Sequence, residues 1–323
     1  MSNIQNVAVF GTGVLGSQIM MQAAYHGKKV IGYDIEQELL DELPQRWEWI
    51  RSGYQRDLGD DDEAYDAERF EQAIANISTT TQVAEALEDC DLVIEAVPEN
   101  LEIKKTVWSQ IGDVAPQKTI FCTNTSSLRP SDFAEATGRK NRFLALHFAN
   151  RVWKFNTGEV MPTEFTDDDA FNTVLEFASE IGLVPIPVRK ETPGYLLNSL
   201  LIPLLDAGAK LYVNGVSNPQ EIDRTWRIAT GAPNGPFEIY DVVGFNVAYN
   251  VSKNSDDPDL RAFSEVLKTG IDAGHAGIAT GAGFYTYDSK GNNTGVAEEM
   301  QIHNIDKIIT DNASTVYTEG ENA

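Results

Sequence analysis

The chain has 323 residues, of which 42% are hydrophobic and 23% are charged, a composition ordinary for a soluble globular protein with room for two domains. Its formal net charge of −24 disfavours partners such as nucleic acid and anionic membrane surfaces. No apolar run reaches the length of a membrane span, and two cysteines are too few for a disulfide framework. Because the N-terminus also lacks a secretory signal, we expect a cytoplasmic protein.

The chain begins with a stretch typical of a dinucleotide-binding loop. Apolar residues 7–10 predict a strand, a G-x-G-x-x-G motif follows, and residues 17–26 continue as a helical pattern. Such glycines permit a tight turn, a close approach of the backbone to a pyrophosphate, and close packing of helix on strand. The helix start offers free N–H groups and a positive dipole to the phosphates. The positions expected to meet the cofactor here are Gly11, Gly13, Val14, Leu15 and Gly16.

A second strand pattern identifies the preferred dinucleotide. Residues 29–33 form this strand, and Asp34 follows it, eighteen residues after Gly16. A carboxylate near this spacing hydrogen-bonds the ribose hydroxyls of adenosine. No Lys or Arg follows Asp34 until Arg46, so a 2′-phosphate would be repelled. We therefore predict that the cofactor is NAD rather than NADP.

Strand and helix patterns alternate through the first 190 residues. Further strands are expected over residues 91–97, 119–122, 142–148 and 183–188. Helical patterns lie between the strands, at residues 36–56, where Pro44 interrupts the pattern, and at residues 101–114 and 168–181. This alternation is typical of an α/β fold with a doubly wound parallel sheet. Residues 1–190 are predicted to form a Rossmann-type NAD-binding domain.

The pattern changes at residues 191–194, where a Pro-Gly pair indicates a hinge. Beyond it the strand patterns end, and helices are expected over residues 195–213, 219–229, 236–251 and 259–273. Residues 191–288 are therefore predicted to form an all-helical C-terminal domain. The apolar faces of its helices would be buried on the first domain or on a second subunit. Residues 289–323 are expected to be a polar tail.

Few residues can supply the base that a dehydrogenase needs for the alcohol proton. His147 lies at the end of apolar strand 142–148, and ligands in open α/β sheets bind at the carboxyl ends of strands. Ser126 follows another strand and would lie at the same edge of the sheet. Glu159, twelve residues after His147, could orient the imidazole, but spacing leaves this pairing open, and His147 could equally be structural. No group of residues has the spacing of metal ligands, so no metal is expected.

Several motifs together resemble those of the L-3-hydroxyacyl-CoA dehydrogenases, and the resemblance covers residues 7–287. Besides the glycine motif, they are Glu95-Ala96-Val97-Pro98-Glu99-Asn100, Asn124-Thr125-Ser126-Ser127-Leu128, Leu146-His147-Phe148, Thr192-Pro193-Gly194-Tyr195 with Asn198, Gly235-Pro236-Phe237-Glu238 and Gly281-Ala282-Gly283-Phe284-Tyr285. The resemblance implies that the chain interconverts (S)-3-hydroxyacyl-CoA and 3-oxoacyl-CoA by hydride transfer with NAD. It also implies a homodimer formed through the helical domain.

The same resemblance assigns roles to individual residues. It implies that His147 is the general base and that Glu159 is its partner. It implies that Ser126 and Asn198 hydrogen-bond the substrate oxygen. Because Asn198 belongs to the helical domain, closure at the hinge would complete the site. The positions implied to contact NAD are Gly11, Gly13, Gly16, Asp34, Glu99, Lys104 and Asn150.

Three segments depart from the family pattern. Asn150 is followed by Arg-Val-Trp-Lys where the family has Pro-Val-Pro, and Ala279 replaces a lysine. Residues 46–57 replace a lysine-rich helix that meets the CoA phosphates. Their three arginines could bind phosphate while Trp47 stacks on adenine; alternatively, the tryptophans pack on the sheet domain and the arginines pair with acidic neighbours. The arginines are Arg46, Arg51 and Arg56, and the acidic neighbours are Glu42, Glu48 and Asp57.

Other functions fit parts of the pattern. A same-fold dehydrogenase of a free 3-hydroxy acid, such as a sugar acid, a carnitine-like compound or hydroxybutyrate, would use Arg151 or Lys154 to bind the carboxylate. The 6-phosphogluconate and β-hydroxyacid dehydrogenases resemble the chain less, because they place a catalytic lysine where this chain has Gly194. A catalytically silent NAD-binding protein is disfavoured by the joint presence of the four residues implied in catalysis.

Overall fold

The computed structural model describes residues 1–59, 65–288 and 291–297 of the chain. The chain divides into two compact units, Met1–Leu197 and Asn198–Ala323, and each unit has a hydrophobic core of its own. The predicted polar tail at 289–323 lies outside the described residues except for residues 291–297. Within the described part of the chain, no helix is both long and apolar enough to cross a membrane.

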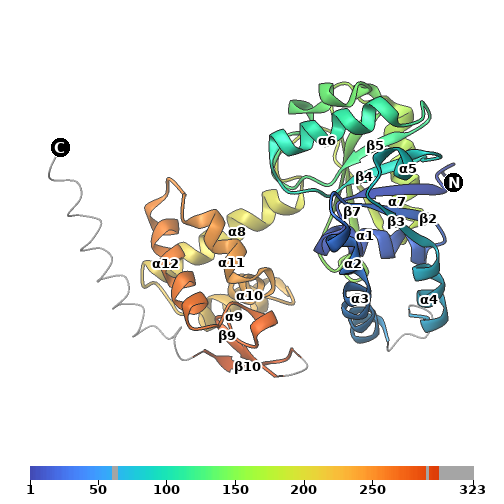
Figure 1. Cartoon of the computed structure of the whole chain (residues 1–323). Coiled ribbons are helices and arrows are strands. Elements are labelled where there is room, and N and C mark those ends of the chain that lie inside the picture. The colour runs from blue at the N-terminus through green and yellow to red at the C-terminus, as the bar shows by residue number, and fades with distance from the viewer. Residues whose placement is uncertain (60–64, 289–290, 298–323) are drawn as a thin grey trace. The chain divides into compact units, whose positions relative to one another are not determined.

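The first unit is built on an eight-stranded sheet with the order β3-β2-β1-β4-β5-β6-β7-β8 (Figure 1). The strands are β1 Asn6–Phe10, β2 Lys29–Tyr33, β3 Ile77–Thr80, β4 Leu92–Glu95, β5 Ile120–Thr123, β6 Phe143–Phe148, β7 Thr157–Pro162 and β8 Val184–Pro187. All neighbouring pairs are parallel except β6 and β7, which are antiparallel. The predicted doubly wound sheet is therefore confirmed. Strands β2 and β3 follow on one side of β1, whereas β4 and the later strands follow on its other side. The point where the strand order reverses in this way is where open α/β sheets bind ligands.

Helices cover both faces of this sheet, which explains why its central strands are apolar at most positions. Along β1, Val7 and Val9 join one core while Ala8 and Phe10 join the other. Residues of α1, α3, α4 and α7 contribute to the first core, and residues of α5 and α6 to the second. The helices of this unit are α1 Val14–Tyr25, α2 Gln37–Asp41, α3 Leu43–Leu58, α4 Ala67–Ala75, α5 Val83–Leu87, α6 Leu101–Val114 and α7 Asp168–Glu180.

Two features of this unit differ from the sequence-based prediction. The helical stretch expected over residues 36–56, with an interruption at Pro44, is two helices, but the break comes before Pro44. Helix α2 ends at Asp41, and Pro44 lies in the first turn of α3, where its missing N–H costs nothing. Strands β3 and β7 were not predicted. The four residues of β3 are mostly polar, and β7 contains Gly158 and Pro162, which weaken a strand pattern.

The second unit is helical, as predicted, and contains a small antiparallel ribbon in addition. Its elements are α8 Leu197–Val213, α9 Pro219–Thr230, α10 Pro236–Val243, α11 Phe245–Ser252, α12 Pro258–Asp272, β9 Tyr285–Tyr287 and β10 Asn293–Val296. The prediction that strands end after the hinge was wrong, since β9 pairs with β10. The prediction of one helix over residues 236–251 was also wrong, because Gly244 has a φ of +88° and separates α10 from α11.

Two buried carboxylates join the segments of the second unit. Asp223 accepts hydrogen bonds from the N–H groups of Phe237 and Glu238, at 2.9 Å each, and from the Tyr285 hydroxyl at 2.8 Å. Asp241 likewise accepts from two N–H groups and one hydroxyl in the segment 284–287. The Gly-Pro-Phe-Glu and Gly-Ala-Gly-Phe-Tyr motifs therefore have a structural role in this unit.

The glycines of these two motifs leave room for the carboxylates. A Cβ atom on Gly235 would lie 2.4 Å from Asp223, and a Cβ atom on Gly283 would lie 2.2 Å from Asp241. Real Cβ atoms do not approach other heavy atoms so closely, so only glycine fits beside each acid.

The buried Asp241 carboxyl predicts a specific dependence of stability on pH. Burial raises the pKa of Asp241 from 3.8 to about 6, despite its three hydrogen bonds. The folded chain thus holds this proton more tightly than the unfolded chain, and the stabilisation it gives at low pH is lost as the pH rises from about 4 to about 6. Asp241→Asn removes this contribution. The variant should melt at a lower temperature than the wild type, but its melting temperature should decline less between pH 4 and pH 6.

The control is Asp272→Asn, which removes a solvent-exposed carboxylate on α12 of the same unit. Its melting curve should follow the wild-type dependence on pH. Identical slopes for the wild type and Asp241→Asn between pH 4 and 6 would contradict this account.

Candidate active site

The candidate catalytic residues lie at the carboxyl ends of two neighbouring strands and on the strand beside them. Ser126 follows β5, His147 is the fifth residue of β6, and Glu159 lies on β7. In the antiparallel pairing of β6 and β7, His147 and Glu159 are direct register partners. Side chains at such positions point to the same face of a sheet. The pairing that sequence spacing left open therefore follows from a strand that the sequence did not reveal.

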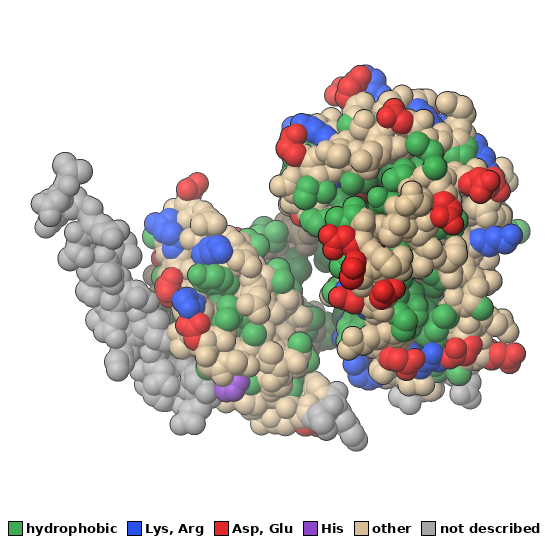
Figure 2. Space-filling model, in the orientation of Figure 1, with side chains coloured by type: hydrophobic (Ala, Val, Ile, Leu, Met, Phe, Trp, Pro, Cys, Tyr) green, Lys and Arg blue, Asp and Glu red, His purple; other side chains and the backbone are tan. Residues whose placement is uncertain are grey.

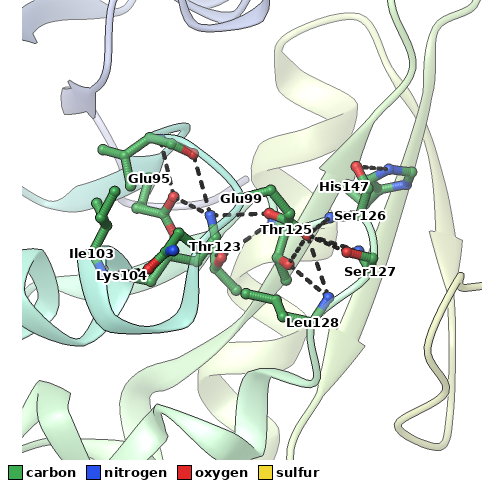
Figure 3. Close-up of polar contacts among 12 residues, drawn as sticks. Glu95, Glu99, Ile103, Lys104, Thr123, Thr125, Ser126, Ser127, Leu128 and His147 are labelled. Atoms are coloured by element: carbon green, nitrogen blue, oxygen red, sulfur yellow. Dashed lines mark hydrogen bonds and ion pairs between the residues drawn. The ribbon is translucent and has the colours of Figure 1, made fainter. Parts of the chain in front are cut away.

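His147 makes a different contact with each of its ring nitrogens. Its Nδ1 lies 2.9 Å from Oε2 of Glu159. Its Nε2 lies 3.2 Å from Oγ of Ser126 (Figure 3). His147 and Glu159 are both buried, with 5% and 3% of their surface exposed. A carboxylate beside Nδ1 holds the proton on that nitrogen, which leaves the lone pair on Nε2. The lone pair then faces the same side as the Ser126 hydroxyl, so Nε2 can accept a proton there.

Glu159 is held in its ionised form by the chain segment after the hinge. Its second oxygen, Oε1, accepts hydrogen bonds from the N–H groups of Leu196 and Leu197, both at 2.9 Å. Burial would raise the pKa of Glu159, but hydrogen bonds from His147 and from these two N–H groups outweigh burial and lower that pKa. The sequence contained no signal for these two backbone contacts.

A second carboxylate shapes the loop that carries Ser126. Oε1 of Glu99 accepts hydrogen bonds from the N–H groups of Ser126 at 3.0 Å, Ser127 at 2.8 Å and Leu128 at 3.3 Å (Figure 3). The same oxygen accepts from the hydroxyls of Thr125 at 2.6 Å and Ser127 at 2.9 Å. Burial would raise the pKa of Glu99, but these hydrogen bonds and the Lys104 ammonium lower it to about 2. Glu99 therefore remains an acceptor that fixes the loop.

Lys104 connects Glu99 to the interior of the sheet. Its ammonium, 1% exposed, lies 2.5 Å from Oε1 of Glu95 and 3.3 Å from Oε2 of Glu99. Glu95 is fully buried and also accepts hydrogen bonds from Thr123 and Trp108. The contacts of Glu99 and Lys104 with NAD implied by the resemblance stay predictions, and both side chains have structural partners within the unit.

The glycine loop fits a bound dinucleotide. Gly11 has a φ of +96°, and a Cβ atom there would lie 2.6 Å from the Ala96 carbonyl. A Cβ atom on Gly16 would lie 1.9 Å from the carbonyl of Gly11, whereas Gly13 has open space around it. Helix α1 begins at Val14 with no side-chain cap and no acidic residue in its first turn. Its first N–H groups, including that of Leu15, are thus available to the pyrophosphate of NAD.

Two further residues implied in cofactor binding lie next to this loop. Asp34 accepts hydrogen bonds from the N–H and the hydroxyl of Thr12, both at 2.7 Å, so its carboxylate is fixed beside the glycine turn. Asn150 accepts a hydrogen bond at 2.7 Å from Gln18 of α1. A carboxylate beside the glycine turn is where an adenosine ribose binds in dinucleotide folds. These positions fit the cofactor roles predicted for Asp34 and Asn150.

The arginines of α3 are paired with carboxylates, which was one of the two alternatives that the sequence left open. Arg46 pairs with Glu42 at 2.7 Å and Arg56 pairs with Asp57 at 3.2 Å. Arg51 pairs with Glu48 and, more closely, with Glu71, which was not predicted. Trp47 is buried in the core with 7% of its surface exposed. Its packing leaves no face for an adenine ring.

The segment after Asn150 is anchored to α3. Arg151 donates to both carboxylate oxygens of Asp57, and the Trp153 indole donates to the same group at 2.9 Å. Burial would raise the pKa of Asp57, but these hydrogen bonds lower it to about 2. Trp153 packs on Gly53, where a Cβ atom would lie 2.4 Å from the indole ring. Arg151 is therefore already engaged, and the hypothesis that it binds a substrate carboxylate lacks support.

Asn198 is the remaining residue implied in catalysis. It is the first residue of the second unit and the second residue of α8. It follows directly on Leu197, whose N–H binds Glu159. Its hydrogen bond to the substrate oxygen stays a prediction. Among the residues that the structure describes, no three His, Cys, Asp or Glu side chains gather as a metal site would require.

The buried ion pairs of Lys104 predict a large effect on stability. Lys104→Met leaves Glu95 and Glu99 without their cation, and an uncompensated buried charge costs about 3–5 kcal/mol. We expect urea denaturation to show a loss of this size in the free energy of unfolding. The control is Lys105→Met, which removes a partly exposed lysine paired with Glu102 on the same helix and should cost less than about 1 kcal/mol. Equal losses for the two variants would contradict the role of Lys104.

Comparison with known proteins agrees with this geometry. Residues 6–192 match the family model described as 3-hydroxyacyl-CoA dehydrogenase, NAD binding domain, and residues 194–287 match its C-terminal domain. The human mitochondrial hydroxyacyl-coenzyme A dehydrogenase is 32% identical over 289 residues, covering 88% of this chain and 91% of the relative. A 3-hydroxybutyryl-CoA dehydrogenase of Clostridioides difficile is 30% identical, covering 87% of this chain and 99% of the relative.

Solved structures extend the comparison. A diketoreductase studied for substrate-directed dual catalysis of dicarbonyl compounds is 51% identical with a TM-score of 0.84, covering 89% of this chain and all of that chain. Mycobacterium tuberculosis FadB2 is 27% identical with a TM-score of 0.75, covering 88% of this chain and 99% of that chain. The chain therefore belongs to the 3-hydroxyacyl-CoA dehydrogenase family, and it is an NAD-dependent oxidoreductase.

Proposed function

We propose that this enzyme interconverts (S)-3-hydroxyacyl-CoA and 3-oxoacyl-CoA, with His147 as the general base. The observation that carries the proposal is the line of contacts from Glu159 through His147 to Ser126. It places an ionised carboxylate on one side of a buried imidazole and a hydroxyl on the other. The relatives named for hydroxyacyl-CoA and 3-hydroxybutyryl-CoA support this substrate class.

The chemistry follows from the positions of the ring nitrogens. NAD, when bound, supplies the acceptor for the hydride that leaves the carbinol carbon. His147 accepts the hydroxyl proton at Nε2, and the resulting imidazolium is stabilised by the Glu159 carboxylate at Nδ1. The Ser126 hydroxyl, 3.2 Å from Nε2, hydrogen-bonds the substrate oxygen and keeps it aligned with the base. In the reverse direction Nε2 returns the proton to the forming alkoxide.

The role of His147 can be tested by replacing it with glutamine. Glutamine retains hydrogen-bonding groups but cannot take up the proton, so we expect His147→Gln to lower kcat by about two to four orders of magnitude. The measurement is NADH formation at 340 nm with 3-hydroxybutyryl-CoA. The Michaelis constant for NAD should change little, because the dinucleotide loop lies on other elements. Near-normal turnover would remove His147 from the role of base.

A second candidate function is the same reaction on a substrate without CoA. The observation that favours it is the pairing of Arg46, Arg51 and Arg56 with carboxylates, which leaves none of these arginines unpaired for CoA phosphates. The similarity to a diketoreductase that acts on dicarbonyl compounds adds support. The substrate would then be a free 3-hydroxy acid or the corresponding small dicarbonyl compound.

Kinetics with matched substrates separates the two candidates. If CoA is recognised, kcat/KM for acetoacetyl-CoA with NADH should exceed that for ethyl acetoacetate by at least about a hundredfold, since CoA binding energy adds to the specificity. If the ion pairs of these arginines prevent CoA from binding, the kcat/KM values for the two substrates should be similar. Turnover of neither compound, with NADH binding intact, would favour a catalytically silent protein.

We further propose that the enzyme is a cytoplasmic homodimer formed through the second unit. Aliphatic side chains of this unit reach the surface (Figure 2). The most exposed of them are Leu200 at 76%, Ile228 at 74%, Val251 at 67%, Val216 at 65% and Val247 at 56%. Exposed apolar patches of this kind mark association surfaces. Two free, buried cysteines suit the reducing conditions of the cytoplasm.

The proposed dimer surface can be tested on α11. Val247 and Val251 are one helical turn apart, so Val247→Glu combined with Val251→Glu places two charges on one face of the helix. Light scattering should show a shift from dimer to monomer. Val184→Glu, at a comparably exposed valine of the first unit, should leave the dimer intact. A wild-type monomer, or a dimer unaffected by the double substitution, would contradict this assignment of the interface.

A further inference from the structure

Tyr195 lies flat against the imidazole of His147. The two ring centroids are 4.4 Å apart and the ring planes differ by 7°. Tyr195 is buried, with 1% of its surface exposed, among the side chains of Ala145, Met161 and Val188. A parallel ring at this distance restricts rotation of the imidazole out of its plane. The proposed mechanism above gives this residue no role.

The Tyr195 hydroxyl reaches the loop that carries Ser126. It donates a hydrogen bond of 2.6 Å to the carbonyl oxygen of Thr125, the residue directly before Ser126. Ser126 in turn lies 3.2 Å from the proton-accepting nitrogen of His147. One side chain therefore contacts the base with its ring and the loop of the substrate-binding hydroxyl with its oxygen. A phenylalanine could make only the first of these contacts.

The backbone at Tyr195 adopts a conformation that few side chains favour. Gly194 has a φ of +82° and Tyr195 has a φ of +53°, in the left-handed region. The next two N–H groups, of Leu196 and Leu197, bind Glu159. Such a conformation persists only where the surroundings over-determine it, and it clusters at functional sites. Here it lets one short segment contact the imidazole and its carboxylate partner together.

We propose that Tyr195 is a positioning residue for the reaction. Its ring fixes the plane of the His147 imidazole, and its hydroxyl fixes the Thr125–Ser126 backbone. As a result, Ser126 Oγ and His147 Nε2 can contact the same substrate oxygen. The inference rests on the proposed function for its kinetic consequence. Its structural part, the link between the hydroxyl and the loop, is independent of which substrate is used.

The first experiment compares Tyr195→Phe with Tyr54→Phe by hydrogen exchange without substrate. Tyr54 is a matched control, because it is equally buried in the same unit and its hydroxyl makes a 2.6 Å hydrogen bond, to Gln22. We expect exchange of the amides at 126–128 to become several-fold faster in Tyr195→Phe and to stay unchanged in Tyr54→Phe. Unchanged exchange in Tyr195→Phe would overturn the proposal, whether or not the protein turns over any substrate.

The second experiment measures kcat with acetoacetyl-CoA and NADH, or with ethyl acetoacetate where that substrate is preferred. We expect Tyr195→Phe to lower kcat about tenfold with an unchanged KM for NADH, because a small displacement of a reacting group is costly. The kcat of Tyr54→Phe should stay within about twofold of the wild-type kcat. If the wild type turns over neither substrate, the proposed function fails, and the exchange experiment still decides whether Tyr195 holds the loop.

A double-mutant cycle separates positioning from a loss of general stability. If the Tyr195 hydroxyl acts through Ser126, then Tyr195→Phe should have little further effect on kcat in a Ser126→Ala background. A merely structural role would give the same fold reduction in both backgrounds, and this additive result would overturn the proposal.

Discussion

The hydrogen bond between His147 and Glu159 depends on one reversal of chain direction in an otherwise parallel sheet. Because β7 runs antiparallel to β6, the two residues are register partners, and their side chains meet at 2.9 Å. The remaining features of the site are arranged around this pair. The N–H groups of Leu196 and Leu197 donate to the other oxygen of Glu159, and the loop after β5 brings Ser126 to the other nitrogen of His147. The antiparallel pair thus gives a strand-end histidine the carboxylate partner that the proposed general base requires.

Hydrogen-bonded carboxylates organise this acidic chain well beyond the pairing of His147 with Glu159. Glu99 gathers the N–H groups of the Ser126 loop, Asp34 holds the glycine turn, and Asp57 anchors the segment after β6. In the second unit Asp241 holds the segment that leads into the ribbon. Glu99, Asp34 and Asp241 accept hydrogen bonds from backbone N–H groups, whereas Asp57 accepts them from the side chains of Arg151 and Trp153. The net charge of −24 therefore includes structural acids as well as solvated ones.

Local patterns in the sequence predicted the doubly wound sheet, the dinucleotide loop and the helical second unit. Long-range pairings were harder to predict. Strand β7 was not predicted, because Gly158 and Pro162 interrupt its pattern. Without that strand, the sequence could not decide whether His147 and Glu159 are in contact. Helix α10 ends at Gly244 because that residue adopts a left-handed conformation, which its neighbours do not reveal. The stacking of Tyr195 on His147 likewise depends on a positive φ, at Gly194 and Tyr195, and the sequence pattern did not predict it.

The departures from the family pattern concern substrate recognition more than chemistry. The arginines of α3 are paired with carboxylates, and Trp153 packs against Gly53 of the same helix. The contacts from Glu159 through His147 to Ser126 are made by the sheet and its loops, and none of these residues takes part in them. The same hydride-transfer chemistry therefore serves either of the two proposed substrate classes.

The protonation of the His147 ring tests the central claim most directly. Glu159 at Nδ1 and a free lone pair at Nε2 require that the neutral imidazole carries its proton on Nδ1. With four histidines in the chain, 15N NMR of the labelled protein can assign each ring. The account predicts a protonated Nδ1 and an unprotonated Nε2 for neutral His147, and loss of this preference in Glu159→Gln. A proton on Nε2 in the wild type would contradict it.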